Sequence, residues 1–187
     1  MPTSDERTGR VHAALLHHLA TRGWEGLDVA TIAEQVGCRP DEVLGGDGRL
    51  ADLVVDALVA ASEHSPALRE PPGTSLREDV IFLLSGQAAD LETDAGRALR
   101  PVMASRPRDP ELVERALSAV MVPRQQLWVQ VVADAVARGE ARPRAMDPLV
   151  LSVGPRMLVA EDLDGGPVTT ARIEELTDLV VLPLLTR

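Results

Sequence analysis

The chain has 187 residues, of which 45% are hydrophobic, and a net charge of −10. This length allows one large or two small domains with a substantial core. Aromatic residues make up only 2% of the chain, which argues against a stacking platform for single-stranded nucleic acid. All 19 basic residues are arginine, a bias that we attribute to codon usage in a GC-rich genome.

The sequence also indicates where the protein resides. The one cysteine, Cys38, excludes an internal disulfide and fits a reducing compartment. The N-terminus lacks the apolar stretch of a signal peptide. No uncharged apolar run approaches the roughly 18 residues that a membrane-spanning helix needs. We therefore expect a cytoplasmic protein with no membrane contact.

The first predicted element is an amphipathic helix over residues 5–22, because its apolar positions Val11, Leu15 and Leu19 recur every four residues. Asp28 is placed to cap a second helix over 29–36.

A glycine turn follows the second helix. Gly37 should end that helix, and Pro40 fits the first turn of a short third helix over 40–44. Asp47 then caps a fourth helix over 48–62, after Gly45 and Gly46.

Residues 65–74 (SPALREPPGT) are predicted to form a linker, because three prolines and a glycine interrupt the periodicity. Six further helices are expected, over residues 75–90, 93–104, 109–120, 121–138, 147–161 and 169–185. Pro101, Pro123 and Pro155 should mark helix starts or kinks rather than interiors. No segment alternates with period two, so the predicted fold class is all-α.

A helix of about eight residues, a glycine turn and a short second helix make up the helix-turn-helix layout. Ile32, Ala33 and Val36 would pack under Val43 and hold the two helices at a wide angle. Many helical proteins contain such a turn, so the spacing alone does not identify a function.

The wider sequence resembles the tetracycline repressor (TetR) family of bacterial transcription regulators. Residues 7–44 resemble its N-terminal domain through the amphipathic first helix, the Arg22-Gly23-Trp24 turn, the cap before Val29, and Thr31-Ile32-Ala33 followed by Val36-Gly37. The runs LREDVIFLL, RDPELVERAL, PRQQLWVQVVADAVARGEARP and MDPLVLSVGPRML are similar to one common type of its C-terminal domain. The resemblance covers residues 7 to 185.

This resemblance implies a division of labour along the chain. It predicts a DNA-binding domain over 1–47, a connecting helix over 48–64, the linker over 65–74, and an effector-binding and dimerisation domain over 75–187. The implied partners are a second copy of the chain, an operator in double-stranded DNA and a small-molecule effector.

The second and third helices, with the start of the fourth, would meet the DNA. The residues expected to do so are Arg39, Pro40, Asp41, Glu42, Leu44, Arg49 and Thr31. The sequence departs from the family here, because Leu44 stands where a tyrosine is usual and Gly46 at or near a usual histidine. Residues 1–64 hold five arginines and eleven acids, a balance of −6, and phosphate binding draws on basic residues.

The C-terminal domain is predicted to hold the effector pocket and the dimer interface. By apolar placement the pocket candidates are Phe82, Leu99, Met103, Met121, Trp128, Val131 and Met157, with Arg156 facing either a protein acid or an anionic effector. The final helix is too apolar for a lone surface helix, and with 121–138 it should form a four-helix interface. The interface candidates are Leu127, Val132, Ile173, Leu176, Leu179, Val180 and Leu184.

Nothing in the sequence predicts an enzyme, a cofactor or a metal site. His17 and His18 are adjacent on a helix and point about 100° apart, so they cannot hold one metal ion together. No Ser/His/Asp set or glycine-rich phosphate loop is present. Two hypotheses remain: a repressor that an effector releases from DNA, and a TetR-like ligand- or protein-binding module that has lost operator binding.

Overall fold

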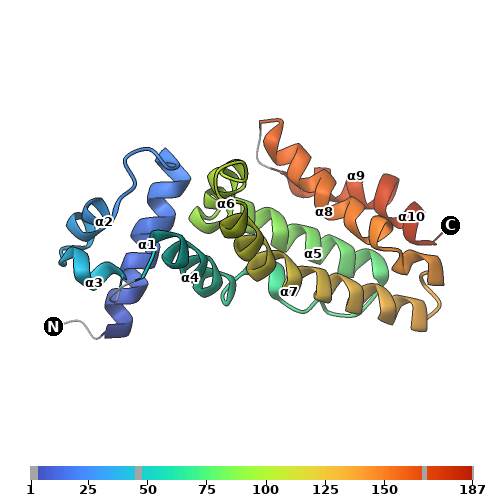
Figure 1. Cartoon of the computed structure of the whole chain (residues 1–187). Coiled ribbons are helices and arrows are strands. Elements are labelled where there is room, and N and C mark those ends of the chain that lie inside the picture. The colour runs from blue at the N-terminus through green and yellow to red at the C-terminus, as the bar shows by residue number, and fades with distance from the viewer. Residues whose placement is uncertain (1–3, 45–47, 166–167, 187) are drawn as a thin grey trace. The chain divides into compact units, whose positions relative to one another are not determined.

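The computed structural model describes residues 4–44, 48–165 and 168–186 (Figure 1). The described residues form helices joined by turns and contain no strand, which confirms the all-α prediction. The helices are α1 (Ser4–Arg22), α2 (Val29–Val36), α3 (Pro40–Leu44), α4 (Leu50–Ser62), α5 (Leu76–Leu91), α6 (Asp94–Ala104), α7 (Pro110–Ala137), α8 (Pro148–Leu163), α9 (Thr170–Leu176) and α10 (Leu182–Thr186). Two short 3-10 helices, η1 (Pro66–Leu68) and η2 (Pro143–Met146), and a π-helical segment, η3 (Thr177–Val181), complete them.

The chain divides into two compact units. Unit 1 comprises Met1–His64 and Thr93–Val122, and unit 2 comprises Ser65–Glu92 and Pro123–Arg187. These units are defined by packing alone. The functional domains predicted from the sequence have different bounds and remain a prediction. Among the described residues, no helix combines the length and the apolar character that crossing a bilayer requires.

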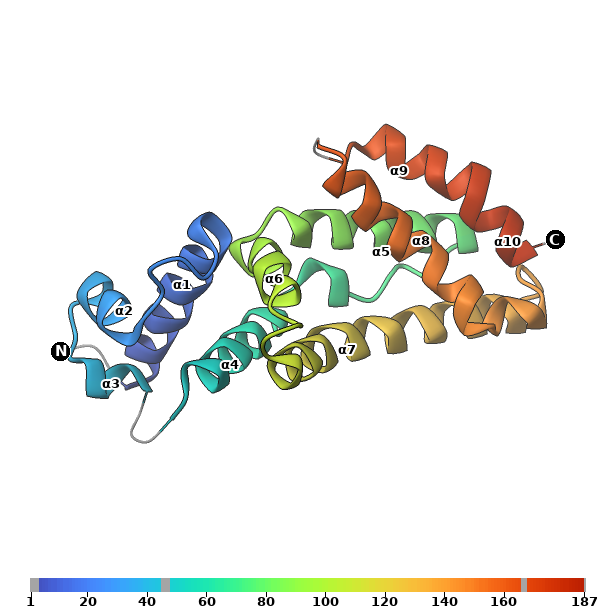
Figure 2. The same ribbon diagram turned by 45° about the horizontal axis from the view of Figure 1, so that its top comes forward.

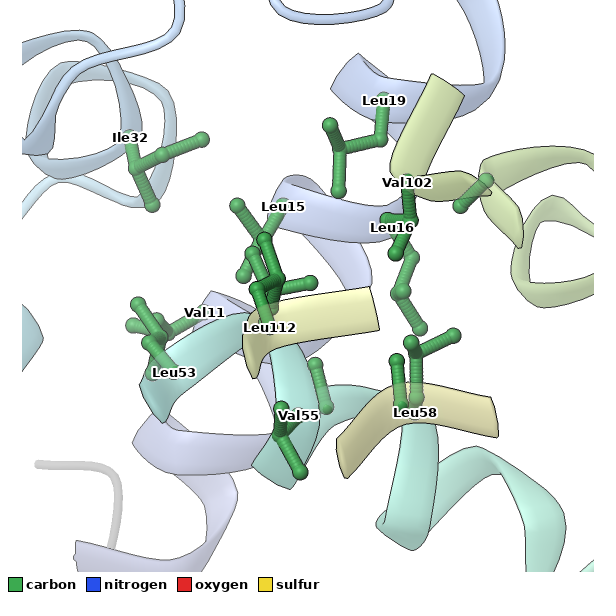
Figure 3. Close-up of a cluster of buried hydrophobic side chains, with 14 of the residues drawn as sticks. Val11, Leu15, Leu16, Leu19, Ile32, Leu53, Val55, Leu58, Val102 and Leu112 are labelled. Atoms are coloured by element: carbon green, nitrogen blue, oxygen red, sulfur yellow. The ribbon is translucent and has the colours of Figure 1, made fainter. Parts of the chain in front are cut away.

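Unit 1 is built around α1. The periodic residues Val11, Leu15 and Leu19 are buried, and Figure 3 shows them facing side chains of the neighbouring helices. Those neighbours are Ile32 of α2, Leu53, Val55 and Leu58 of α4, Val102 of α6 and Leu112 of α7. Burial of such a side chain contributes about 1.5–3 kcal/mol, so this cluster positions the helix-turn-helix.

Unit 2 packs α5 against the second half of α7, α8 and the C-terminal helices. In Figures 1 and 2 the helix α8 lies beside α9. Gly154 lets α8 approach its neighbours closely, because a Cβ added there would lie 3.1 Å from Val181 and 3.6 Å from Trp128. The core of the unit includes Val80 and Leu84 of α5, Trp128 and Val132 of α7, Leu158 of α8, and Ile173 and Leu176 of α9.

The prediction for the prolines was wrong. Pro101, Pro123 and Pro155 lie inside α6, α7 and α8, and the helices predicted over 109–120 and 121–138 are one helix. Proline removes one helical hydrogen bond, at a cost of about 3 kcal/mol, yet all three helices continue through it. Two of the prolines also take part in contacts with other helices or turns, because the carbonyl of Pro101 accepts a hydrogen bond from Trp24 Nε1 at 2.9 Å and that of Pro155 accepts one from Gln87 Nε2 at 3.0 Å.

Two further segments differ from their predictions. The predicted linker begins with η1, and its residues Ser65 and Ala67 are buried. The predicted final helix is interrupted by η3, where Thr177 is fully buried and its hydroxyl donates to the carbonyl of Ile173 at 2.8 Å. The predicted cap Asp47, with Gly45 and Gly46, lies outside the described residues.

Candidate nucleic-acid interface and apolar surface

Local hydrogen bonds fix the start and the end of α2. The Asp28 carboxylate accepts a hydrogen bond from the backbone N–H of Thr31 at 2.7 Å, as a capping residue does, and this bond lowers the pKa of that carboxyl. Gly37 has φ of 72°, and its N–H donates to the carbonyl of Ala33 at 2.9 Å. A positive φ is costly for other residues, so the glycine sets the direction in which α3 leaves. Both features confirm the sequence prediction.

The short helix α3 is anchored by Val43, its one buried residue. Val43 lies in the same buried cluster as Ile32, Ala33 and Val36 of α2. Leu44 is half-buried and packs against that cluster as well. Of the remaining residues, Pro40 and Asp41 are exposed and Glu42 is half-buried, so α3 presents its N-terminal turn to solvent.

The charges on α3 are paired with one another and with α1. Arg39 Nη2 donates to Asp41 Oδ2 at 2.8 Å, with the two side chains 73% and 67% exposed. Glu42 accepts from the backbone N–H of Arg39 at 2.9 Å and from Arg7 Nη1 at 3.1 Å. Exposed ion pairs contribute about 0–1 kcal/mol, so Arg39 can exchange Asp41 for a phosphate at small cost. Glu42, by contrast, also supports the helix start and its attachment to α1.

Two arginines of α1 that were not among the predicted DNA contacts lie next to the helix-turn-helix. Arg7 reaches Glu42, and Arg10 Nη2 donates to the carbonyl of Val36 at the end of α2. Their spacing of three residues on the polar side of a predicted helix is the only sequence signal that could have identified them.

The other two predicted DNA contacts, Arg49 and Thr31, differ in exposure. Arg49 is exposed at the start of α4, where its backbone N–H donates to Asp52 Oδ2 at 3.3 Å. Thr31 is half-buried, and its hydroxyl donates to the carbonyl of Gly26 at 3.2 Å. Arg39, Pro40, Asp41 and Arg49 are therefore the predicted residues with freely exposed side chains.

The eight predicted pocket residues do not gather within one unit. Leu99, Met103 and Met121 belong to unit 1, and the others belong to unit 2. Trp128 and Val131 are buried in the unit 2 core, with half-buried Met157 packed against it, whereas Phe82 is half-buried and outside that cluster. Met103 is 50% exposed and Arg156 is exposed, which argues against an enclosed site for these two. Apolar character and position in a helix do not distinguish a pocket wall from an ordinary core.

Three predicted interface residues need correction. Val132, Ile173 and Leu176 are 0%, 3% and 5% exposed within the single chain, so their side chains stabilise the subunit core and offer no surface to a partner. Leu179 is 68% exposed, and Leu127, Val180 and Leu184 are half-buried. Sequence periodicity showed that these helices are apolar, but not which apolar face the subunit itself covers.

Four of the eight exposed large apolar side chains in the described part of the chain, and all three exposed leucines, lie on α8 and η3. We call Leu149, Val159, Leu163 and Leu179 the α8 surface; these residues are 70%, 36%, 61% and 68% exposed. Arg172 of α9 pairs with Glu161 of α8 at 2.7 Å, so the two helices adjoin at the surface. Three exposed leucines on two adjoining helices suit an interaction surface better than a solvent-facing one.

The family model for the C-terminal domain of tetracycline repressor-like proteins matches residues 70–180. No curated protein matches this chain in sequence. Among solved structures, a protein of Rhodococcus sp. classified with the TetR-family transcriptional regulators is 18% identical, with a TM-score of 0.77 over 97% of this chain and 100% of that one.

Two other solved structures are similar over nearly their whole length. A protein of Mesorhizobium loti, classified in the same way, is 16% identical, with a TM-score of 0.75 over 98% of this chain and 97% of that one. A TetR family transcription regulator is 19% identical, with a TM-score of 0.68 over 97% of this chain and 100% of that one. Because the family model matches more than half of the chain and these structures share its fold, the chain belongs to the tetracycline repressor-like (TetR) family.

Proposed function

We propose that the protein is a transcription regulator that binds operator DNA as a homodimer and is released by a small apolar or amphipathic effector bound by its C-terminal part. It has no catalytic role in this account. The observation that carries the proposal is the exposed N-terminal turn of α3, which presents Arg39 and Pro40 on a helix-turn-helix fixed by Asp28, Gly37 and Val43.

Helix-turn-helix dimers read two successive major grooves, which lie roughly 34–36 Å apart. An effector that changes the spacing of the two reading helices would release the DNA, because the affinities for effector and operator are then coupled. Effector binding is proposed to lie within residues 75–187, beside the buried apolar cluster that contains Trp128 and Val131, with Met157 packed against it.

The dimer is proposed to form through the α8 surface. This differs from the interface first predicted, in which 121–138 joined the final helix, since the most exposed leucines lie on α8 and η3. Pairing of α8 and the C-terminal helices with their copies across a two-fold axis would still produce a four-helix interface.

A second candidate function is a ligand- or protein-binding module without DNA binding. The pairing of Arg39 with Asp41 and of Arg7 with Glu42 favours it, because these bases are already engaged by acids. A module of this kind would show no salt-dependent binding to duplex DNA, whereas the affinity of a DNA-binding protein falls with salt, by about 0.9 in log affinity per unit of log salt for each phosphate neutralised.

Arg39→Ala and Asp41→Asn distinguish the two functions. If α3 meets DNA, Arg39→Ala weakens binding by about 1–3 kcal/mol, whereas Asp41→Asn strengthens it by removing a repelling carboxylate. Fluorescence anisotropy at low salt measures both effects on a duplex that the protein has enriched from genomic fragments.

The matched control is Glu114→Gln, which removes one exposed charge from α7 in the same unit. An equal gain from Asp41→Asn and Glu114→Gln would reflect net charge alone. Unchanged binding in Arg39→Ala would refute a DNA contact by α3 and favour the second function. Glu42→Gln is unsuitable as a charge test, since Glu42 also holds the start of α3 and Arg7.

A further inference from the structure

The helix α8 is apolar on two opposite sides. On one side Gly154 and Leu158 are buried and face the core of unit 2. On the other side Leu149, Val159 and Leu163 are exposed. A helix that only covered its own core would carry polar residues on its outer side, so the outer side of α8 is available to another molecule.

The outer side of α8 has the spacing of residues that meet a partner helix. We call Leu149, Ser152, Arg156, Val159 and Leu163 the α8 stripe, and its members are separated by three, four, three and four residues. This alternation keeps side chains in one line along a helix, as in the contact seam of a coiled coil. Ser152 is half-buried, and the other four residues are exposed. The stripe therefore suits a second helix that lies along it.

The stripe is symmetric about Arg156. Leu149 lies seven residues before Arg156 and Leu163 lies seven residues after it, while Val153 and Val159 lie three residues to either side. When two identical helices cross antiparallel at one residue, each position meets the position that is equally far on the other side of that residue. A crossing at Arg156 thus places Leu149 of one copy against Leu163 of the second copy. Such self-complementarity is what a two-fold interface requires.

Other crossing points on the stripe do not pair both leucines. With the crossing at Ser152, Leu163 would face a position before the start of α8 at Pro148. With the crossing at Val159, Leu149 would face a position beyond the end of α8 at Leu163. The pattern of apolar residues therefore favours Arg156 as the centre and a second copy of the chain as the partner.

The centre of the stripe carries a positive charge without a compensating acid. Arg156 is exposed and forms no ion pair with any residue in the described part of the chain. The segment 148–160 of α8 contains no aspartate or glutamate. On the C-terminal segments, Glu175 and Asp178 are already paired with arginines of their own subunit. At an antiparallel crossing, the guanidinium of one copy would thus meet that of the second copy, and like charges in contact repel.

We propose that two copies pair antiparallel along the α8 stripe, with Arg156 of one copy facing Arg156 of the second copy at the two-fold axis. The leucines at the two ends of the stripe stabilise the dimer, and the two guanidiniums oppose it. Arg156 therefore limits the strength of the dimer and decides which chains can join it. This inference rests on the dimer of the proposed function and does not depend on DNA or effector binding.

Mixing two chains of opposite charge at position 156 tests the axis. Only a residue that faces its own copy gives a mixed dimer that replaces two like-charge contacts by an ion pair. When wild-type protein is equilibrated with Arg156→Glu labelled with a heavy nitrogen isotope, the mixed dimer should exceed its statistical proportion by about fivefold in native mass spectrometry. Arg144→Glu makes the same charge change at an exposed residue of η2 and should mix statistically.

The dissociation constant of Arg156→Leu supplies the second measurement. This variant removes the repulsion and extends the apolar stripe, so sedimentation equilibrium should show a dimer about tenfold tighter than the wild type. Arg144→Leu is the control and should leave the dissociation constant unchanged.

Three results would overturn the inference. A weaker dimer in Arg156→Leu would show that Arg156 meets a carboxylate of the second copy. Statistical mixing of Arg156→Glu with a dimeric wild type would refute the register and leave the proposed dimer in place. A monomeric wild type would contradict the register and the proposed dimer together.

Discussion

Leu163→Asp combined with Leu179→Asp is expected to convert the protein from a dimer to a monomer. Both leucines are more than 60% exposed in the single chain, at 61% and 68%, so the substitutions leave the subunit core intact. Burial of a leucine contributes about 1.5–3 kcal/mol. Each leucine occurs twice in a two-fold dimer, so the two substitutions would remove four leucines from the interface. The association free energy should therefore fall by about 6–12 kcal/mol before the cost of burying carboxylates.

Light scattering at micromolar concentration measures the change, with circular dichroism to confirm that the helices remain. Val129→Asp is the matched control, because Val129 is 42% exposed on α7, the helix first predicted to join the interface. Dissociation by Val129→Asp alone would place the interface on α7. A wild-type protein that is monomeric at this concentration would contradict dimer formation altogether.

Gly86→Ala is expected to lower the free energy of unfolding by about 3 kcal/mol, the upper end for overpacking. The added Cβ would lie 2.6 Å from the Pro66 carbonyl oxygen and 3.1 Å from the Ala67 Cα. These are backbone atoms that cannot rotate away, so η1 must move off α5. Alanine favours a helix over glycine by about 1 kcal/mol, so helix propensity alone would make Gly86→Ala stabilising. A loss of stability would therefore reflect the steric clash.

Gly9→Ala is the control, since Gly9 lies in α1 with nothing within 4 Å of an added Cβ. It should raise stability by about 0.5–1 kcal/mol through helix propensity alone. Urea unfolding monitored by circular dichroism measures both variants. Stabilisation by Gly86→Ala would show that η1 does not rest on α5 as described.

Local chemistry made much of the fold predictable. Asp28, Gly37 and Pro40 act on backbone groups within a few residues, and the repeat of Val11, Leu15 and Leu19 identifies a buried helix face. The prolines inside α6, α7 and α8 were not predictable, because local propensity alone predicts that a helix ends or kinks at proline.

The candidate site was predictable only in part. The sequence located the helix-turn-helix and the exposed Arg39, but not the contact of Arg7 with Glu42, which lies 35 residues away. The apolar residues of the final helix were found, yet their two faces have different roles: Ile173 and Leu176 complete the core, and Leu179 is exposed. The bond between Asp90 and Arg124 likewise depends on two helices meeting in space.

Selection of genomic fragments of the source organism by the purified protein at low salt tests the central claim most directly. The account predicts enrichment of one pseudo-palindromic sequence, with half-sites about one helical turn or a multiple apart. That enrichment should weaken in Arg39→Ala and disappear in the Leu163→Asp, Leu179→Asp variant. A folded, dimeric wild-type protein that enriches no sequence would contradict the account and leave the ligand- or protein-binding module as its function.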